Sequence, residues 1–215
     1  TWSHSTKMEI VWTVIPVIIL IYLTLPAVKL LIKMEDASNS ELSIQVTGSQ
    51  WKWHYKYLDK NIEFYSNLST PSEQFKKGNY DASGAANNPN YLLEVDNELV
   101  IPAGIKVRFL VTASDVIHSW WVPDLAVKKD AIPGFINEMW TNVPEDKLGT
   151  YRGQCTELCG KDHGFMPVVV KVVSQADFDI WVSLKNEERL AAEAAAAKAA
   201  SENWDMDKLM ALGKT

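Results

Sequence analysis

The segment from Cys155 to Met166 constrains this chain most, because it holds both cysteines of the sequence together with a histidine and a methionine. Soft sulfur ligands combined with imidazole are typical of copper sites, whereas carboxylate-rich sets suit magnesium, calcium or manganese. A second imidazole is available far upstream, so it must come from a different strand. The fold therefore has to gather side chains from two separate parts of the chain: His118, Cys155, Cys159, His163 and Met166.

Two other interpretations of this set are open. A disulfide between Cys155 and Cys159 is permitted in an exported domain. Zinc also accepts two cysteines and two histidines in a tetrahedral site. A disulfide leaves His163 and Met166 without a role, and zinc leaves the thioether unused. We therefore favour a redox copper site, in which methionine accompanies histidine and cysteine.

Residues 10–28 form an apolar segment without a charged side chain. At about 1.5 Å per residue, a helix of this length measures roughly 28 Å, close to the hydrocarbon thickness of a bilayer. A signal peptide would have a shorter apolar region followed by a small-residue cleavage site, and neither is present. The sequence therefore predicts a transmembrane helix. Lys7, Lys29 and Lys33 flank it at both ends, so the positive-inside rule does not orient it.

Alternating side chains after the membrane segment predict several short β-strands. Residues 42–46 and 105–111 alternate apolar with polar side chains, and residues 50–57 alternate with aromatic rings. Further strand signals lie at residues 91–95, 99–101 and 168–173, with a turn at residues 102–104. Short strands separated by turns indicate an all-β sandwich.

The C-terminal region predicts a long helix. Ser174 and Asp177 occupy capping-box positions, and the alanine-rich stretch that follows favours helix to about residue 200. This stretch has almost no apolar face, which is typical of a spacer rather than a domain. Residues 203–215 are amphipathic and predict a terminal helix that docks on a neighbour. Residues 66–90, rich in Ser, Gly, Asn and Pro, predict instead a long surface loop.

Two motifs, HSWWVPDLAVKKDAIPG and YRGQCTELCGKDHGFMP, closely resemble subunit II of bacterial-type cytochrome c oxidase, which carries the dinuclear copper centre CuA. The resemblance runs from about residue 8 to about residue 185. It implies an all-β cupredoxin-like Greek-key sandwich with an N-terminal transmembrane helix and a C-terminal α-helical tail. The metal loop would lie between the final two strands. The chain departs from the family at Phe135, where an arginine often follows the Pro-Gly pair.

The resemblance also implies which groups hold the two copper ions of CuA. Each cysteine bridges both coppers as a thiolate, and each histidine binds one copper. The methionine completes one site, and the backbone carbonyl of a glutamate completes the other. The matching positions are His118, Cys155, Glu157, Cys159, His163 and Met166.

Five positions receive further roles from the resemblance. Trp51 would be the ring through which electrons enter CuA, although its aromatic run is also typical of a strand core. Glu9 matches a glutamate at the mouth of a proton channel into the catalytic subunit, although carboxylates are common at membrane edges. The Glu157 side chain would reach a magnesium or manganese ion at the boundary with that subunit. Asp96 and Asp115 match acids that dock cytochrome c, although aspartate is also a frequent turn residue.

We therefore expect the electron-entry subunit of a respiratory terminal oxidase, passing electrons from a c-type cytochrome through CuA to a haem in subunit I. Oxygen reduction would take place in subunit I of this oxidoreductase. Subunit I, subunit III, the donor cytochrome and membrane lipid are the implied partners. The net charge of −6 argues against nucleic acid and permits a basic partner. The implied location is the bacterial inner membrane, with the copper domain on the periplasmic side.

Rival functions remain to be tested against this expectation. The copper domain of nitrous-oxide reductase shares the CuA motif, but a membrane helix and the lack of a second catalytic domain count against it. A quinol-oxidase subunit II is not expected, because the ligand set is intact. A membrane-anchored binding module with a disulfide between Cys155 and Cys159 is the rival from a different class.

We expect three regions along the chain. Residues 1–35 would be the transmembrane helix, residues 36–185 the copper domain, and residues 186–215 a helical linker with the start of a further domain. The membrane helix resembles the second of the two that the family usually has, so the chain would begin part-way into the protein. Residues 204–215 resemble the opening helix of a class I cytochrome c. We expect either a covalent haem c domain in a continuation or a short docking tail.

Overall fold

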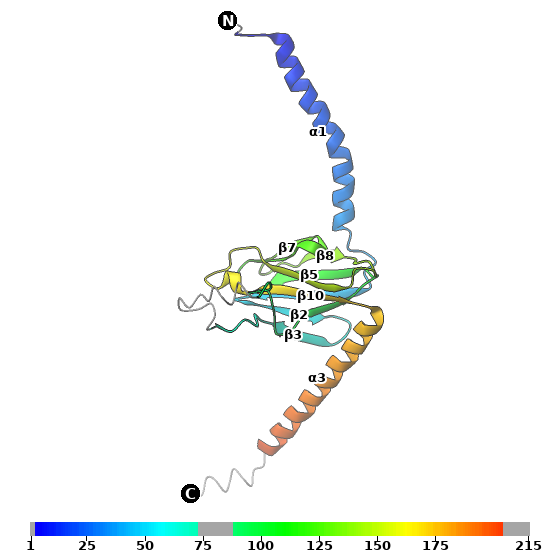
Figure 1. The fold of residues 1–215 in the computed structure, drawn as a ribbon, viewed down its shortest axis with the longest axis vertical. Coiled ribbons are helices and arrows are strands. Elements are labelled where there is room, and N and C mark those ends of the chain that lie inside the picture. The colour runs from blue at the N-terminus through cyan, green and yellow to red at the C-terminus, as the bar shows by residue number, and fades with distance from the viewer. Residues whose placement is uncertain (1–2, 73–87, 204–215) are drawn as a thin grey trace. The chain divides into compact units, whose positions relative to one another are not determined.

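The computed structural model describes residues 3–72 and 88–203 of the chain. The chain forms two compact units, Thr1–Asn39 and Ser40–Thr215 (Figure 1). The first unit contains one long helix, and the second contains two β-sheets and a further long helix. The division into three regions at residues 35 and 185 remains a prediction.

Helix α1 (Thr6–Glu35) contains the apolar segment that was predicted to cross a membrane. It is the one helix in the described ranges that is long and apolar enough to do so. None of its described side chains is buried by the protein, as expected for a helix whose surroundings are lipid. Pro16 and Pro26 lie inside the helix, a placement that membrane helices tolerate.

The described residues of the second unit form ten strands in two sheets of five. The strands are β1 (Leu42–Ser49), β2 (Lys52–Tyr57), β3 (Ile62–Ser66), β4 (Leu99–Pro102), β5 (Val107–Ala113), β6 (His118–Val122), β7 (Val127–Ala131), β8 (Asn137–Thr141), β9 (Gly149–Cys155) and β10 (Pro167–Val173). One sheet has the order β3-β2-β1-β5-β8, and the other has the order β4-β10-β9-β6-β7. Two pairs, β1 with β5 and β10 with β4, are parallel, and the other pairs are antiparallel. The predicted β-sandwich is therefore confirmed.

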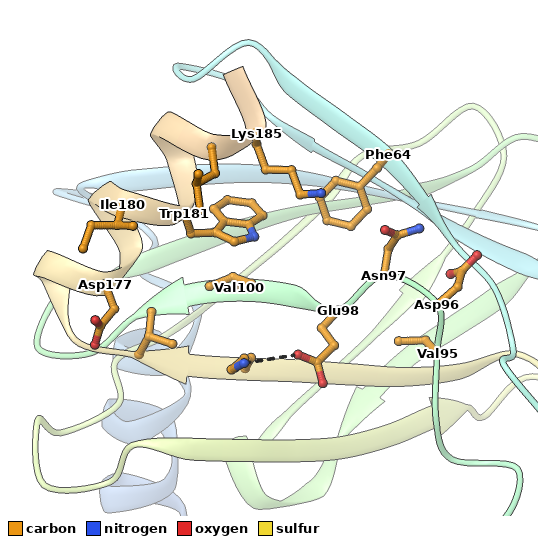
Figure 2. Close-up of a pocket in the computed structure, with 13 residues that line it drawn as sticks. Phe64, Val95, Asp96, Asn97, Glu98, Val100, Asp177, Ile180, Trp181 and Lys185 are labelled. Atoms are coloured by element: carbon orange, nitrogen blue, oxygen red, sulfur yellow. Dashed lines mark ion pairs between the residues drawn. The ribbon is translucent and has the colours of Figure 1, made fainter. Parts of the chain in front are cut away.

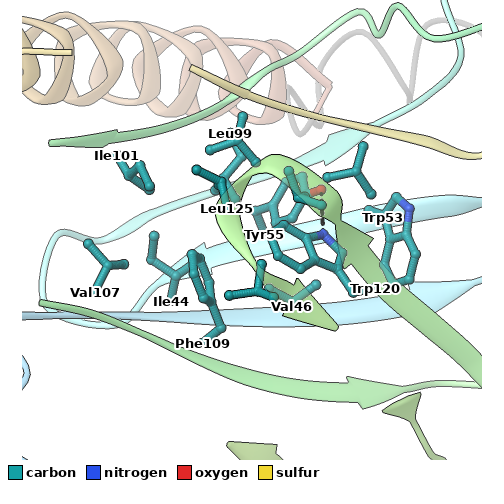
Figure 3. Close-up of a cluster of buried hydrophobic side chains, with 14 of the residues drawn as sticks. Ile44, Val46, Trp53, Tyr55, Leu99, Ile101, Val107, Phe109, Trp120 and Leu125 are labelled. Atoms are coloured by element: carbon teal, nitrogen blue, oxygen red, sulfur yellow. Dashed lines mark hydrogen bonds between the residues drawn. The ribbon is translucent and has the colours of Figure 1, made fainter. Parts of the chain in front are cut away.

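The two sheets enclose a core in which large aromatic rings from both layers meet (Figure 3). Strand β2 contributes the alternate residues Trp53, Tyr55 and Tyr57, all fully buried, as its period of two requires. The indole N–H of Trp120, on β6 of the other sheet, donates a hydrogen bond to the Tyr55 hydroxyl at 3.2 Å. The Phe109 and Trp120 rings lie 5.1 Å apart between centroids. The rings that alternate along β2 therefore pack against a ring of the opposite sheet.

The strand predicted at residues 91–95 is wrong. Leu92 has a φ of 61°, in the left-handed region, which breaks an extended strand. The backbone N–H of Leu93 donates to the carbonyl of Asn90 at 2.9 Å, closing a turn. Only Val95 makes a bridge, with Leu68. The apolar residues here favour a strand, but Asn and Pro just before them favour turns.

Helix α3 (Gln175–Asn203) begins as the capping box predicted. The backbone N–H of Asp177 donates to the Ser174 hydroxyl at 3.1 Å. The first turns pack on the sandwich, where the rings of Tyr57 and Trp181 lie 5.2 Å apart. The helix runs without interruption past residue 186.

The amphipathic tail and the haem continuation that we expected concern residues 204–215 and beyond, outside the described residues. Most of the predicted surface loop at residues 66–90 also lies outside them.

Candidate metal centre

The metal loop predicted between the last two strands joins β9 to β10, and β6 brings His118 beside it. Trp120 pairs with Cys155 across the antiparallel β6 and β9, so His118, two residues earlier on the same face, points toward the cysteine. Gly153 permits this close approach of the strands, because a Cβ there would lie 1.9 Å from the Trp121 carbonyl oxygen. The register between β6 and β9 therefore places the His118 imidazole next to Cys155.

The two cysteines are close to each other and remain free thiols. Their sulfur atoms lie 3.9 Å apart, almost twice the length of a disulfide bond. The Cys155 sulfur is also 3.9 Å from His118 Nδ1. Ligand atoms from His118, Cys155 and Cys159 all lie within 4.8 Å of one another, and the three residues are buried. This group has the donors and the spacing of a metal site.

The remaining donors predicted from the sequence lie beside one or the other of the two sulfur atoms. Its sulfur is 3.4 Å from His163 Nδ1 and 3.6 Å from the Met166 Sδ. The other thiol, that of Cys155, donates to the backbone carbonyl of Glu157 at 3.4 Å. The structure thus gathers every predicted donor group around the two sulfur atoms.

His118 is held in place by Trp53, Gly48 and Asp115. Its ring lies edge-on to Trp53, with centroids 6.0 Å apart. Gly48 lies directly against the ring, so close that a Cβ at this position would be 2.9 Å from His118 Cδ2. Its Nε2 lies 2.9 Å from Asp115 Oδ1. The imidazole is therefore confined on several sides, with Nδ1 left facing sulfur.

The two thiols differ in their acidity. Burial acts most strongly on Cys155 and would raise its pKa, but hydrogen bonding with His118 and other neighbours outweighs burial, and the pKa is lowered. Burial and the nearby Cys155 raise the pKa of Cys159 to about 12. Burial alone would lower the pKa of His118, but Cys155 and Asp115 reverse the direction and raise it. A metal ion that takes both sulfurs as thiolates must therefore displace a firmly held proton from Cys159.

The turn between β1 and β2 also contacts the metal loop. The Trp51 indole N–H donates to the carbonyl oxygen of Cys159 at 3.2 Å. The Gln50 side-chain amide donates to the same oxygen at 2.9 Å. Gly160 closes the contact, because a Cβ there would lie 3.0 Å from the Trp51 ring. Trp51 thus lies against the predicted ligands, whereas Gln50 was not predicted from the sequence.

The two aspartates expected to dock cytochrome c already have partners within the chain. Asp96 accepts hydrogen bonds from the backbone N–H and the side-chain amide of Asn67, at 2.7 and 2.9 Å. Asp115 contacts His118 and accepts from the backbone N–H of Gln50 at 2.7 Å. Each therefore organises a loop, and the docking role remains a prediction.

The Glu157 side chain is exposed on the metal loop, although its backbone carbonyl contacts the Cys155 sulfur. The Glu9 carboxylate lies 2.8 Å from His4 Nδ1 in the first unit. Phe135, where an arginine is frequent, is 67% exposed.

A cavity of about 700 Å³ lies between α3 and β4, lined by Trp181, Phe64 and charged residues (Figure 2). None of its lining residues is one of the predicted ligands.

Comparison with known proteins gives one consistent family. The model described as cytochrome c oxidase subunit II, periplasmic domain, matches residues 42–173, and the model for the transmembrane domain of the same subunit matches residues 1–30. Probable cytochrome c oxidase subunit 2 of Rickettsia bellii is 47% identical over 186 residues, covering 86% of this chain and 65% of the relative. The Rickettsia conorii protein of the same name is 49% identical over 187 residues, covering 86% and 55%. The chain thus spans between about half and two thirds of the length of these curated relatives.

Solved structures agree with the fold. The periplasmic domain of subunit II of cytochrome oxidase (CoxB) from Bradyrhizobium japonicum has a TM-score of 0.58 and 38% identity, covering 71% of this chain and 98% of that one. A mixed disulfide intermediate between a thioredoxin-like protein and subunit II of cytochrome c oxidase has a TM-score of 0.54 and 38% identity, covering 71% and 97%. These similarities confirm the cupredoxin-like sandwich, and the transmembrane family model agrees with the N-terminal apolar helix.

Proposed function

The chain belongs to the cytochrome c oxidase subunit II family, and from that membership we propose that it is the electron-entry subunit of a respiratory terminal oxidase. It is an inner-membrane protein whose β-sandwich lies on the periplasmic side, as the two family models that it matches describe. Electrons would arrive from a c-type cytochrome and leave toward a haem in subunit I. Oxygen reduction belongs to subunit I in this proposal.

One observation carries the proposal: two free thiols, two imidazoles and a thioether converge at the metal loop, and all of these side chains except the partly exposed His163 are buried. The family implies copper, and this donor set fits copper better than zinc, because the thioether sulfur of Met166 lies among the donors. When bound, a dinuclear copper centre supplies a carrier that accepts and releases one electron at a time. The chain's own residues then have to hold the ligands rigidly in both oxidation states.

The proposed ligands follow the geometry of the two sulfur atoms. Cys155 and Cys159 would hold the copper centre as thiolates, and each sulfur lies beside a different imidazole. His118 would bind through Nδ1 next to Cys155, and His163 through Nδ1 next to Cys159. The thioether next to Cys159 and the backbone carbonyl next to Cys155 would complete the two sites; these come from Met166 and Glu157.

Trp51 would carry the electron from the donor to the centre. Its ring is partly exposed, and its N–H is hydrogen-bonded to the carbonyl of Cys159, a proposed ligand residue. An electron on the indole therefore reaches Cys159 through a single hydrogen bond. Trp51 is only partly buried against the core, whereas the other indole of this run, Trp53, is fully buried.

Contacts with the rest of the oxidase form a second part of the proposal. The exposed carboxylate of Glu157 would reach a magnesium or manganese ion at the boundary with subunit I. Glu9, at the start of α1, would stand at the entrance of a proton channel. Subunit III and a basic donor cytochrome would be further partners, the donor being attracted by the net charge of −6.

The rival functions are less well supported. The distance of 3.9 Å between the two sulfur atoms does not favour a binding module built on a disulfide. A nitrous-oxide reductase is not favoured, because the family models cover both the membrane helix and the sandwich of this chain.

Rapid mixing of the purified oxidase with a reduced c-type cytochrome tests the proposed function. We expect the copper absorption of this subunit to bleach before the haem of subunit I is reduced. In a His163→Ala variant that lacks the centre, haem reduction should slow at least tenfold. Equal rates of haem reduction in the two proteins would show that electrons enter elsewhere.

A further inference from the structure

Three loops at one end of the sandwich are joined by a continuous series of hydrogen bonds. The first loop follows β5 and carries Asp115, the second joins β1 to β2 and carries Gln50, and the third is the metal loop with Cys159. We propose that Asp115 and Gln50 are positioning residues that fix His118 relative to the carbonyl group of Cys159. The proposal rests on the proposed function, because it assumes that these two residues hold the metal.

The first link fixes the imidazole ring. His118 is fully buried, and Nε2 lies 2.9 Å from Asp115 Oδ1. A carboxylate only accepts hydrogen bonds, so Nε2 carries the proton and donates. Nδ1 is then the nitrogen with a free lone pair, and it is the one that faces the Cys155 sulfur. Asp115 thus selects both the tautomer and the orientation of the ring, as a carboxylate does for a ligating histidine in many metal sites.

The second link joins Asp115 to the turn between β1 and β2. The other carboxylate oxygen of Asp115 accepts the backbone N–H of Gln50 at 2.7 Å. Asp115 Oδ1 additionally accepts the backbone N–H of Val116 at 2.7 Å. Hydrogen bonds to an ionised acceptor are among the stronger ones, so the carboxylate is held firmly in place.

The third link reaches the metal loop. The Gln50 side-chain amide donates to the carbonyl oxygen of Cys159 at 2.9 Å, and the Trp51 indole donates to the same oxygen. Both lone pairs of that oxygen are therefore used. Close packing at Gly160 supports the contact, because a Cβ there would lie 3.1 Å from the Gln50 amide nitrogen. The turn cannot move without moving the backbone of Cys159.

The series predicts a particular kind of coupling. His118 and Cys159 come from different strands and would bind the same pair of metals, so their relative position sets the geometry of the centre. Asp115→Ala removes the link between His118 and the turn, and Gln50→Ala removes one of the two hydrogen bonds from the turn to the Cys159 carbonyl, so both changes weaken the same connection. The effects of two cuts should therefore be far from additive, as expected for residues in one network.

A double-mutant cycle on the intact, membrane-purified oxidase tests the proposal, with the reduction potential and the copper hyperfine splitting as readouts. The variants are Asp115→Ala, Gln50→Ala and both together. We expect each single change to shift both readouts with copper retained, and the double variant to shift them no further than the larger single effect. Asp115→Asn keeps one carbonyl acceptor, and it should restore at least half of the effect of Asp115→Ala.

Matched controls separate this outcome from general damage. Asp124→Asn and Gln154→Ala change the same residue types at exposed positions and should leave both readouts at wild-type values. Gln50 lies in an exposed turn, so its variant should fold even if the Asp115 variants do not. In that case an unshifted Gln50→Ala protein overturns the proposal, and a shifted one supports it. Additive shifts in the double variant would also overturn it. A wild-type oxidase without copper in this subunit would instead refute the proposed function.

Discussion

The indole N–H of Trp51 donates a hydrogen bond to the carbonyl oxygen of Cys159 at 3.2 Å. This contact joins a partly exposed aromatic ring to the backbone of a predicted metal ligand. The next tryptophan along the chain, Trp53, is fully buried and donates instead to the carbonyl of Met166 at 3.2 Å. Two neighbouring indoles thus contact two different parts of the metal loop, one from the surface and one from the core.

Replacing Trp51 with phenylalanine should slow electron entry and leave the copper spectrum unchanged. Phenylalanine lacks the N–H that bonds to Cys159, but the Gln50 amide still holds that carbonyl. We expect stopped-flow reduction by the donor cytochrome to slow by at least tenfold. Trp140→Phe, on strand β8, is the matched control and should react at the wild-type rate. An unchanged rate in Trp51→Phe would assign this ring to packing alone.

Replacing Gly48 with alanine should disturb the centre through His118. The added Cβ would lie 2.9 Å from His118 Cδ2, a distance that requires the ring or the strand to shift. We expect about 1–3 kcal/mol of overpacking strain and a lower copper content after purification. Gly164→Ala, inside the metal loop but with open space around the new Cβ, should retain copper at the wild-type level. If the two variants hold equal copper, Gly48 does not position the imidazole.

Replacing Trp53 with phenylalanine should lower stability and loosen the methionine side of the site. The change removes the hydrogen bond to the Met166 carbonyl and leaves a small cavity beside His118. We expect a loss of roughly 2 kcal/mol in the free energy of unfolding. Loss of copper absorption on heating should occur at a lower temperature than in wild type. A melting temperature within error of wild type would contradict this.

Copper uptake by the metal-free protein should release protons and become stronger as pH rises. Burial and Cys155 raise the pKa of Cys159 to about 12, so this thiol is protonated at neutral pH. A metal binds the thiolate, so each uptake event must displace that proton, and a lower proton concentration favours binding. Copper titrations between pH 6 and 8, in buffers of different ionisation enthalpy, should show this release. Affinity that falls as pH rises over this range would contradict the expected sign.

Much of the fold was predictable, because the hydrophobic periods are clear. The period of two in Trp53, Tyr55 and Tyr57 predicts a strand with its rings in the core, and all three are buried. The uncharged segment of residues 10–28 predicts a membrane helix, and it lies inside α1. The strand expected at residues 91–95 failed, because apolar content without alternation does not distinguish a strand from a turn such as the one around Leu92.

The metal donors could be predicted from their chemistry, but their supports could not. Cysteine, histidine and methionine side chains are rare enough in this chain to attract attention wherever they cluster. Gly48 and Gln50 are common residue types in turns or strand ends, and no local pattern marks them, whereas Asp115 was expected only as a docking acid. They act only because three distant loops meet in space, and contacts between such distant segments cannot be derived from local residue spacing.

Metal analysis combined with electron paramagnetic resonance of the purified protein tests the central claim most directly. We predict two copper ions per chain and a signal from one unpaired electron shared between them, with neither cysteine in a disulfide. The sulfur, imidazole and thioether groups that converge on Cys155 and Cys159 are the basis of this prediction. One zinc ion and no copper, or a disulfide between the two cysteines, would contradict it.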